Sequence, residues 1–301
     1  MSFESKLREV KKNIKTSSQD TYLRNIRRLR KVNAELPIPL KSAWLTTDKI
    51  FDWYKKQPLN VRRHMSTAAV VAMSVYKKEN VKWKKLQRGA MKEFDEERAS
   101  RQLSSKQKEL IPKGGFDRIK KVITQLKREM THIKTIDTLK QLIRFQDLII
   151  LSLYYEYPLR LDYATLNVGK NGVNRIYKNK KKPKGWFIEL TDFKTQKSEG
   201  NKIFKLNLAN QRLLNKFIPS VQRLTKHGFL LSNSRGGKMS KQVLSKRLMG
   251  ITSKRIGKKF SVQLLRILYA MRNRDVIESA REVSNKLLHS QKQSLQYAKK
   301  E

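Results

Sequence analysis

The stretch from Thr138 to Tyr163 reads TLKQLIRFQDLIILSLYYEYPLRLDY, and it carries the strongest structural signal in the chain. The segment Thr138–Tyr157 predicts a strongly apolar helix that ends before Pro158, because the residue before a proline disfavours helical conformation. Its longest apolar run, Leu148–Leu153, is too short and too closely flanked by polar residues to span a bilayer. We therefore expect a buried helix, with Arg160 just beyond its end.

Short strands and further helices surround that stretch. Residues 173–177, 186–193 and 202–206 have strand-like composition, and the polar segment 194–201, which contains Gly200, predicts a hairpin loop. The spacing of apolar residues predicts five more helices, at Phe116–Met130, Asn210–Ile218, Ser240–Gly250, Val262–Met271 and Asp275–Leu288. The second half of the chain therefore combines helices with a small antiparallel sheet.

The first half of the chain is predicted to be helical throughout. Three helices are expected: one from Gln19 or Asp20 with Ser17–Ser18 as its cap, one between Thr46-Thr47-Asp48 and Pro58, and one at Met65–Tyr76. Small residues in the third helix would allow close helix packing. Phe51, Trp53 and Tyr54 of the second helix are expected to be core residues rather than base-stacking residues.

The composition shifts between roughly Glu93 and Gly115, and the shift ends in Pro112-Lys113-Gly114-Gly115. Such a stretch is typical of a linker, or of an exposed helix followed by a linker. We expect a helical domain over residues 1–100, a linker over 101–115 and a second domain over 116–301. The predicted fold class is mainly α with a small antiparallel β-sheet, in which an N-terminal helical domain precedes a mixed α/β domain.

The chain is strongly basic, with 69 Lys and Arg residues against 25 Asp and Glu residues and a formal net charge of +44 on 301 residues. A phosphate backbone is the usual partner of such an excess, because neutralising phosphates releases condensed counterions. An anionic membrane surface would need a long apolar anchor, which the sequence lacks. We therefore expect double-stranded DNA, or at the least a nucleic-acid backbone, as the partner, and no membrane.

Some residue types and motifs do not occur in the sequence, and their absence limits the kinds of reactive site that we expect. The chain has no cysteine, which excludes disulfides, thiolate zinc sites and a cysteine nucleophile. Paired acidic residues at metal-ligand spacing, a phosphate-binding glycine loop and a Ser/His/Asp set are also missing, so we expect no metal, no cofactor and no small-molecule substrate. The start, MSFESKLREVKKN, has no apolar stretch and is not expected to be a signal peptide, so secretion is not expected.

Five short sequence elements occur one after another in the second half of the chain. They are Arg160 after the buried helix, Lys194 before Thr195 in the predicted hairpin, Gln263 and Arg266 in SVQLLR, His289 in LLHS, and Tyr297 near the end. Each element alone is a weak signal, because an arginine after a helix is usually solvated or ion-paired and a lysine in so basic a chain is usually only a charge. Their order is the informative feature.

In that order the elements resemble the catalytic domain of the tyrosine recombinase (phage integrase) family, over roughly Phe116 to Tyr297. The helical first half, with Ser-x-x-Thr-Tyr at Ser18–Tyr22, resembles the core-binding domain of the family. The resemblance implies that the two domains clamp double-stranded DNA and that a homo-tetramer assembles on two DNA sites. The protein would be a site-specific recombinase or integrase of a mobile element or a large DNA virus, located with DNA in a nucleus, a viral factory or a bacterial-type cytoplasm.

The resemblance also implies a mechanism. Tyr297 would attack a scissile phosphate, form a 3′-phosphotyrosyl link and release a 5′-hydroxyl. Arg160 and Arg266 would hold the non-bridging oxygens, since a guanidinium stays charged and presents a planar fork of donors. Lys194 would protonate the departing 5′-oxygen, and His289 would donate a hydrogen bond to the phosphate. Religation with a different 5′-hydroxyl needs no ATP.

Two departures from the family pattern concern the later elements. Gln263 stands where His or Lys is usual, and its amide can hydrogen-bond a phosphate but cannot carry a proton at neutral pH. The LLHS segment lacks the usual glycine and the step from His289 to Tyr297 is short, so Tyr297 could also come from a neighbouring subunit. Lys197 is the alternative to Lys194, which is preferred because it stands at the expected strand end.

Three alternatives to a recombinase stay open. One is a relative that binds DNA with the same fold but is catalytically impaired. Another is a topoisomerase IB-like or telomere-resolvase-like nicking–closing enzyme with the same tyrosine chemistry. The third is a non-enzymatic protein that packages DNA or binds RNA. The basic run Lys178–Lys184 is expected to be a solvated loop against phosphates, and Asp162 and Tyr163 are expected to pack against and orient Arg160.

Overall fold

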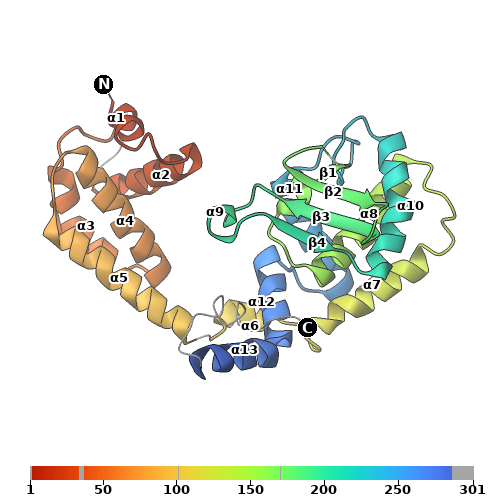
Figure 1. The fold of residues 1–301 in the computed structure, drawn as a ribbon. Coiled ribbons are helices and arrows are strands. Elements are labelled where there is room, and N and C mark those ends of the chain that lie inside the picture. Colours follow the sequence, from red (N-terminus) through yellow and green to blue (C-terminus); the bar gives the residue numbers. More distant parts are fainter. Residues whose placement is uncertain (1, 34–36, 101, 170, 287–301) are drawn as a thin grey trace. The chain divides into compact units, whose positions relative to one another are not determined.

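A computed structural model describes residues 2–33, 37–100, 102–169 and 171–286 of the chain. The chain divides into two compact units, Met1–Leu103 (unit 1) and Ser104–Glu301 (unit 2), and each unit has its own buried apolar core. Figure 1 labels the helices and strands of both units in chain order. Within the described ranges, no helix is long and apolar enough to cross a membrane.

Unit 1 consists of helices in its described part. They are α1 (Phe3–Val10), α2 (Thr16–Asn33), the 3-10 helix η1 (Ala43–Thr46), α3 (Asp48–Lys55), α4 (Leu59–Val75) and α5 (Val81–Ala99). Trp83 of α5 is completely buried, and its indole N–H donates to the carbonyl oxygen of Leu45 at 2.9 Å. This bond ties the last helix of unit 1 to the turn before α3.

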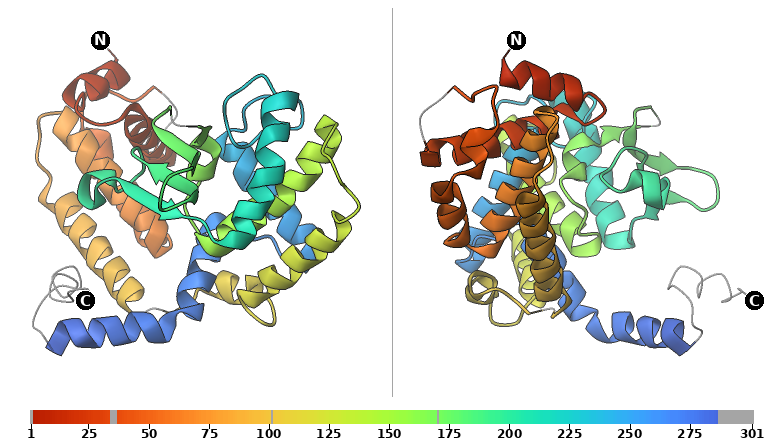
Figure 2. Two further views of the ribbon diagram at one scale, coloured as in Figure 1. Left: turned by 45° about the vertical axis from the view of Figure 1, so that its right-hand side comes forward. Right: turned by 90° about the vertical axis from the view of Figure 1, so that its left-hand side faces the viewer.

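The three helices predicted in the first half are present, with longer extents for two of them. The helix α2 begins at Thr16, before the expected cap, and α4 begins directly after Pro58, whose extended ψ of 151° precedes the first helical turn. Ala68, Ala69 and Ala72 of α4 have no exposed surface. Their small side chains allow the close packing of α4 against α5 that the left view of Figure 2 shows.

The expectation for the aromatic residues of α3 is confirmed at two positions and holds only in part at the third. Phe51 and Tyr54 are buried to 3% and 2% exposure. Trp53 is only half-buried and lies at the edge of the core. The helix turns Ile50, Phe51 and Tyr54 inward, so that Trp53 keeps part of its ring at the surface.

Unit 2 contains helices and one small sheet. Its elements are α6 (Ser105–Leu110), α7 (Asp117–Glu129), α8 (Leu139–Glu156), the 3-10 helix η2 (Asp162–Thr165), β1 (Asn167–Val168), β2 (Asn174–Asn179), β3 (Gly185–Leu190), α9 (Gln196–Glu199), β4 (Lys202–Lys205), α10 (Leu208–Leu224), α11 (Lys241–Ile256), α12 (Val262–Arg272) and α13 (Arg274–Lys286). The predicted fold class, mainly α with a small sheet, is confirmed.

The sheet itself is mixed, which corrects the prediction of a purely antiparallel sheet. Its strand order is β1-β2-β3-β4, with antiparallel pairing of β2 with β3 and of β3 with β4. The strand β1 runs parallel to β2, with Asn167 opposite Arg175. Gly169 and Gly172 have positive φ angles of 110° and 107°, which let the chain turn back within a few residues. A strand of two residues leaves no alternation in the sequence to predict it.

The stretch expected to be a linker contains a helix that belongs to unit 2. Ser104 caps α6, and Gln107 completes a capping box with it. At the other end of α6, Leu110 and Ile111 pack against the core of unit 2. The boundary between the compact units therefore falls at Leu103, before the Pro–Gly stretch and not within it.

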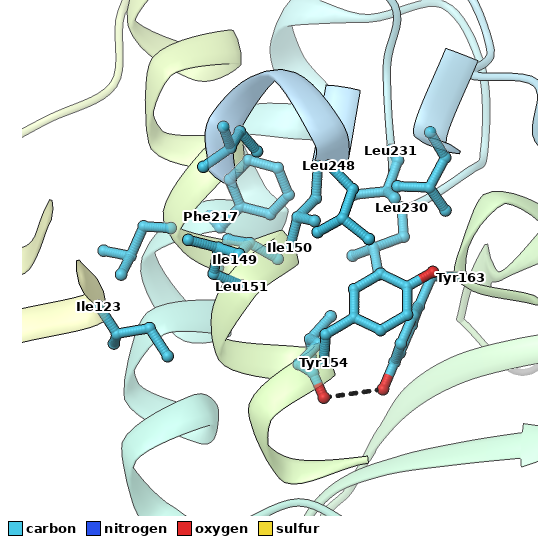
Figure 3. Close-up of a cluster of buried hydrophobic side chains, with 14 of the residues drawn as sticks. Ile123, Ile149, Ile150, Leu151, Tyr154, Tyr163, Phe217, Leu230, Leu231 and Leu248 are labelled. Atoms are coloured by element: carbon cyan, nitrogen blue, oxygen red, sulfur yellow. Dashed lines mark hydrogen bonds between the residues drawn. The ribbon is translucent and has the colours of Figure 1, made fainter. Parts of the chain in front are cut away.

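The buried helix predicted from the opening stretch is confirmed as α8. Thr138 caps it through a capping box with Gln141, and every residue of Leu148–Leu153 is buried. Figure 3 shows Ile149, Ile150 and Leu151 of α8 among Phe217 of α10 and Leu248 of α11. The helix is therefore central to the core of unit 2, and the chain that leaves it carries Arg160.

Candidate active site

The backbone around Arg160 is held to the end of α8 by two buried tyrosines. The hydroxyl of Tyr154 donates to the carbonyl oxygen of Arg160 at 2.8 Å. The hydroxyl of Tyr163 lies 3.0 Å from the carbonyl oxygen of Leu153 and 2.6 Å from that of Tyr157. The two rings also contact each other edge to face, with centroids 4.9 Å apart (Figure 3). Arg160 therefore leaves the helix from a rigid turn, with its own side chain half-buried.

Asp162 places a carboxylate next to Arg160. It is the first residue of η2 and is only 7% exposed. Burial raises the pKa of this carboxyl, and the positive charges of Lys241, Arg160 and Arg266 act in the opposite direction. One buried carboxylate therefore stands among three cations from three separate segments of the chain.

Arg266 reaches the same place from α12. Ser261 caps this helix, with its hydroxyl accepting from the Leu264 N–H at 3.1 Å. Burial lowers the pKa of Arg266, the positive charge of Arg160 lowers it further, and Asp162 raises it. The two guanidinium groups are therefore close enough for the charge of one to act on the other. Arg266 nevertheless stays protonated at neutral pH, because a guanidinium cannot lose its proton in a protein.

The cation Lys241 was missed by sequence reasoning. It is the first residue of α11, which Ser240 caps and which packs against η2. The sequence predicted a helix that begins at Ser240, but nothing in its pattern indicated a role for Lys241. The three cations around Asp162 leave an excess of positive charge, and the half-buried guanidinium groups have little water to offset it. An anion with several oxygens, such as a phosphodiester, complements this cluster.

Gln263 lies one turn before Arg266 on α12. Residues three apart share a helix face, so Gln263 stands on the side of α12 that carries Arg266. Its side chain is exposed. It can therefore reach a ligand at the arginine pair with an amide, but it offers no titrating group there.

Lys194 lies in the loop between β3 and β4, which projects from the sheet and carries the single turn α9 (Figure 1). The strand β3 ends at Leu190, so Lys194 stands in the turn that leads into α9 and not at a strand end. Its side chain is exposed, as is that of Lys197 on α9. Neither lysine is among the cations that lower the pKa of Asp162.

Asn174 anchors the base of this loop, and sequence reasoning missed it. Its side chain is 4% exposed. The amide nitrogen donates to Thr165 Oγ1 at 3.0 Å and to the carbonyl oxygen of Asp192 at 2.8 Å. The amide oxygen accepts from the backbone N–H groups of Thr191 and Asp192, both at 3.0 Å. One side chain thus joins β2, the loop of Lys194 and the η2 turn of Asp162.

His289 and Tyr297 lie outside the described residues. For metal ions, the described part of the chain offers no group of three or more His, Asp or Glu residues that could hold one. Within the described residues, the candidate site therefore consists of Arg160 and Arg266 with Asp162 and Lys241.

Comparison with known proteins adds little to this site. No family model matches the sequence, and no curated protein matches it. The chain resembles a crystal structure of XerA recombinase at 11% sequence identity and a TM-score of 0.39, over 99% of this chain and 93% of that one. A resemblance this distant leaves the chemistry to be argued from the residues of the chain itself.

Proposed function

We propose that the chain is a DNA strand transferase of the tyrosine recombinase type, which cleaves and rejoins double-stranded DNA without metal or ATP. One observation carries the proposal. Arg160 and Arg266, far apart in the sequence, both lower the pKa of the buried Asp162 carboxyl, and the charge of Arg160 also lowers the pKa of Arg266. Two guanidinium groups that repel each other are stabilised when a phosphate binds between them.

The arginine pair suits the transition state of phosphoryl transfer. Negative charge is spread over the non-bridging oxygens of the phosphorus, and fixed cations stabilise it without rearranging during the reaction. The negative charge of Asp162 offsets part of the repulsion between the two guanidinium groups, and Lys241 is a third positive charge that lowers the pKa of the same carboxyl. This set supplies charge stabilisation and orientation, and the nucleophile must come from elsewhere.

The residue order supports Tyr297 as that nucleophile. Its hydroxyl oxygen would bond to phosphorus while the bond from phosphorus to the 5′-oxygen breaks, and the 3′-phosphate would remain on the enzyme. Lys194 would give its proton to the 5′-oxygen, and His289 would hydrogen-bond the phosphate. Gln263 cannot take the tyrosine proton, so another base or water must accept it, and we expect slow cleavage.

A covalent trap tests the proposal with a pool of DNA sequences in place of one cognate site. The full chain is incubated with a library of nicked duplexes of random sequence, in which a short 5′-hydroxyl fragment diffuses away after cleavage. Protein–DNA adducts that survive detergent are isolated and sequenced. We expect adducts with the wild type and none with Tyr297→Phe or Arg160→Ala.

A matched variant controls for the loss of positive charge. Arg235 is an exposed arginine of unit 2 outside the cluster, so Arg235→Ala removes the same side chain without touching the site. It should form adducts as the wild type does. If the wild type binds duplex but gives no adduct from the library, the strand-transferase proposal is wrong and a DNA-binding protein without cleavage remains.

Joining separates a recombinase from a nicking–closing enzyme. An intact duplex with the recovered sequence is mixed with a second, labelled copy at low ionic strength. A recombinase should produce strands joined between the two copies and should assemble a tetramer only with DNA present. Adducts without joined products would point instead to relaxation of a single duplex.

A further inference from the structure

A hollow of about 650 Å³ lies in unit 1, between α2 and α3, away from the residues proposed for strand transfer. Its lining is mostly basic. Four of its seven residues are basic, and the other three are acidic, aromatic and aliphatic: Arg28, Lys31, Lys49, Lys56, Asp52, Trp53 and Val32. Figure 1 shows the two helices that carry them. The hollow is shallow and wide open to solvent.

The charges of the hollow are not balanced by its own residues. Asp52, the acidic residue, is paired with Lys55 outside the hollow at 3.2 Å. Within the described ranges, no ion pair engages Lys31, Lys49 or Lys56. Their like charges are held on two packed helices, so a bound anion relieves their repulsion.

The aromatic residue, Trp53, is the most exposed of the four tryptophans. Trp44, Trp83 and Trp186 are at most 7% exposed, whereas Trp53 is half-buried and lines the hollow. The guanidinium of Arg28 lies 5.6 Å from the centroid of its ring. An indole beside a guanidinium gives two flat groups, and both of them stack on nucleobases.

We propose that this hollow binds single-stranded nucleic acid, with a base stacked at Trp53 and Arg28 and the flanking phosphates at Lys31, Lys49 and Lys56. Stacking needs a base whose face is free, which a strand without a partner offers and an intact duplex does not. The site does not depend on the strand-transfer proposal, because it lies in the other unit and needs no covalent step.

Tryptophan fluorescence of the full chain tests the site directly. Oligothymidylate and oligouridylate of about twelve nucleotides, which is within the range that such sites span, serve as probes, and an intact duplex serves for comparison. Because the other three tryptophans are buried, we expect both single strands to quench Trp53, and we expect the duplex to leave it unchanged. The strand that quenches at lower concentration identifies DNA or RNA as the better ligand. Equal quenching by the duplex, or no quenching by either strand, overturns the proposal.

Substitutions separate stacking from general attraction to phosphate. Base stacking contributes about 1 to 3 kcal/mol per base, so Trp53→Leu should weaken oligothymidylate binding by at least about fivefold in an anisotropy assay. Trp53→Phe should recover part of that loss. Phe94→Leu is the matched control, since Phe94 also lies under a guanidinium, that of Arg63 at 3.8 Å, but outside the hollow. A loss in Phe94→Leu as large as in Trp53→Leu overturns the proposal.

An abasic oligomer of the same length completes the test, because it keeps the phosphates and lacks the bases. The wild type should bind it more weakly than oligothymidylate, and Trp53→Leu should bind the two equally. Lys56→Ala should flatten the dependence of log affinity on log salt by about 0.7. If the wild type binds the abasic and thymidine strands equally, the base does not stack and the proposal fails.

Discussion

Replacing Asn174 by alanine should loosen the loop that carries Lys194. The amide of Asn174 makes four hydrogen bonds, to Thr165, to Thr191 and twice to Asp192. At a net contribution of about 0.5 to 1.5 kcal/mol each, the four bonds stabilise the closed loop by roughly 2 to 6 kcal/mol. Asp192 is exposed and Thr191 half-buried, so water replaces part of what is lost. We expect a loss of about 2 kcal/mol, which makes the open loop about 30 times more populated.

Hydrogen exchange measures this opening, because the backbone N–H groups of Thr191 and Asp192 donate to the amide oxygen of Asn174. In Asn174→Ala, both amides should exchange about 30-fold faster, since a loss of about 2 kcal/mol corresponds to that factor. The control is Asn201→Ala in the same loop, where the lost side chain accepts one bond, from Gln196 at 3.3 Å, on an exposed surface. Unchanged exchange at Thr191 and Asp192, or equal acceleration in the control, would refute the anchoring role.

Two further predictions concern buried polar groups of unit 2. Since burial raises the pKa of Asp162, protonation favours the folded state; that stabilisation is complete at low pH and is lost as pH rises through the folded pKa. Relative to Asp162→Asn, the wild type should therefore lose unfolding free energy in urea titrations as the pH rises from below the ordinary carboxyl range through the raised pKa of Asp162, and parallel pH profiles would contradict this. Gln146 is fully buried and bonds both backbone groups of Ser232, at 2.9 and 2.8 Å. Gln146→Leu leaves those groups unsatisfied and should lower the unfolding free energy by about 2 to 4 kcal/mol in the same titrations, whereas Gln242→Leu, at an exposed position, should change it little.

Asn174 has a mainly structural role, but it can also affect the proposed chemistry. Asn174 links the η2 turn of Asp162 to the loop of Lys194. If Lys194 is the general acid, Asn174→Ala should slow covalent adduct formation while leaving duplex affinity unchanged. An unchanged rate of adduct formation in that variant would favour Lys197 or another acid.

Local patterns were enough to predict α8 and three helices of unit 1, but α1 and α5 of unit 1 were not predicted. Thr138–Tyr157 combines a cap, an apolar run and a following proline, and the helix α8 ends one residue before the predicted bound. Patterns were insufficient where two faces of a helix were equally apolar. In α3, Ile50 with Trp53 and Tyr54 has helical spacing, but the structure buries Phe51 in place of Trp53. Only the neighbouring helices decide between those faces.

The basic charge and the order of the motif residues were determined by the sequence alone, because both are properties of the chain read residue by residue. The tertiary structure decided which of the basic residues are neighbours. Arg160 lies in a turn, Lys241 in the first turn of α11 and Arg266 in the second turn of α12. Only the packing of α11 and α12 in unit 2 brings their charges near Asp162. Spacing along the chain carries no information on such convergence, since it depends on how distant elements share one core.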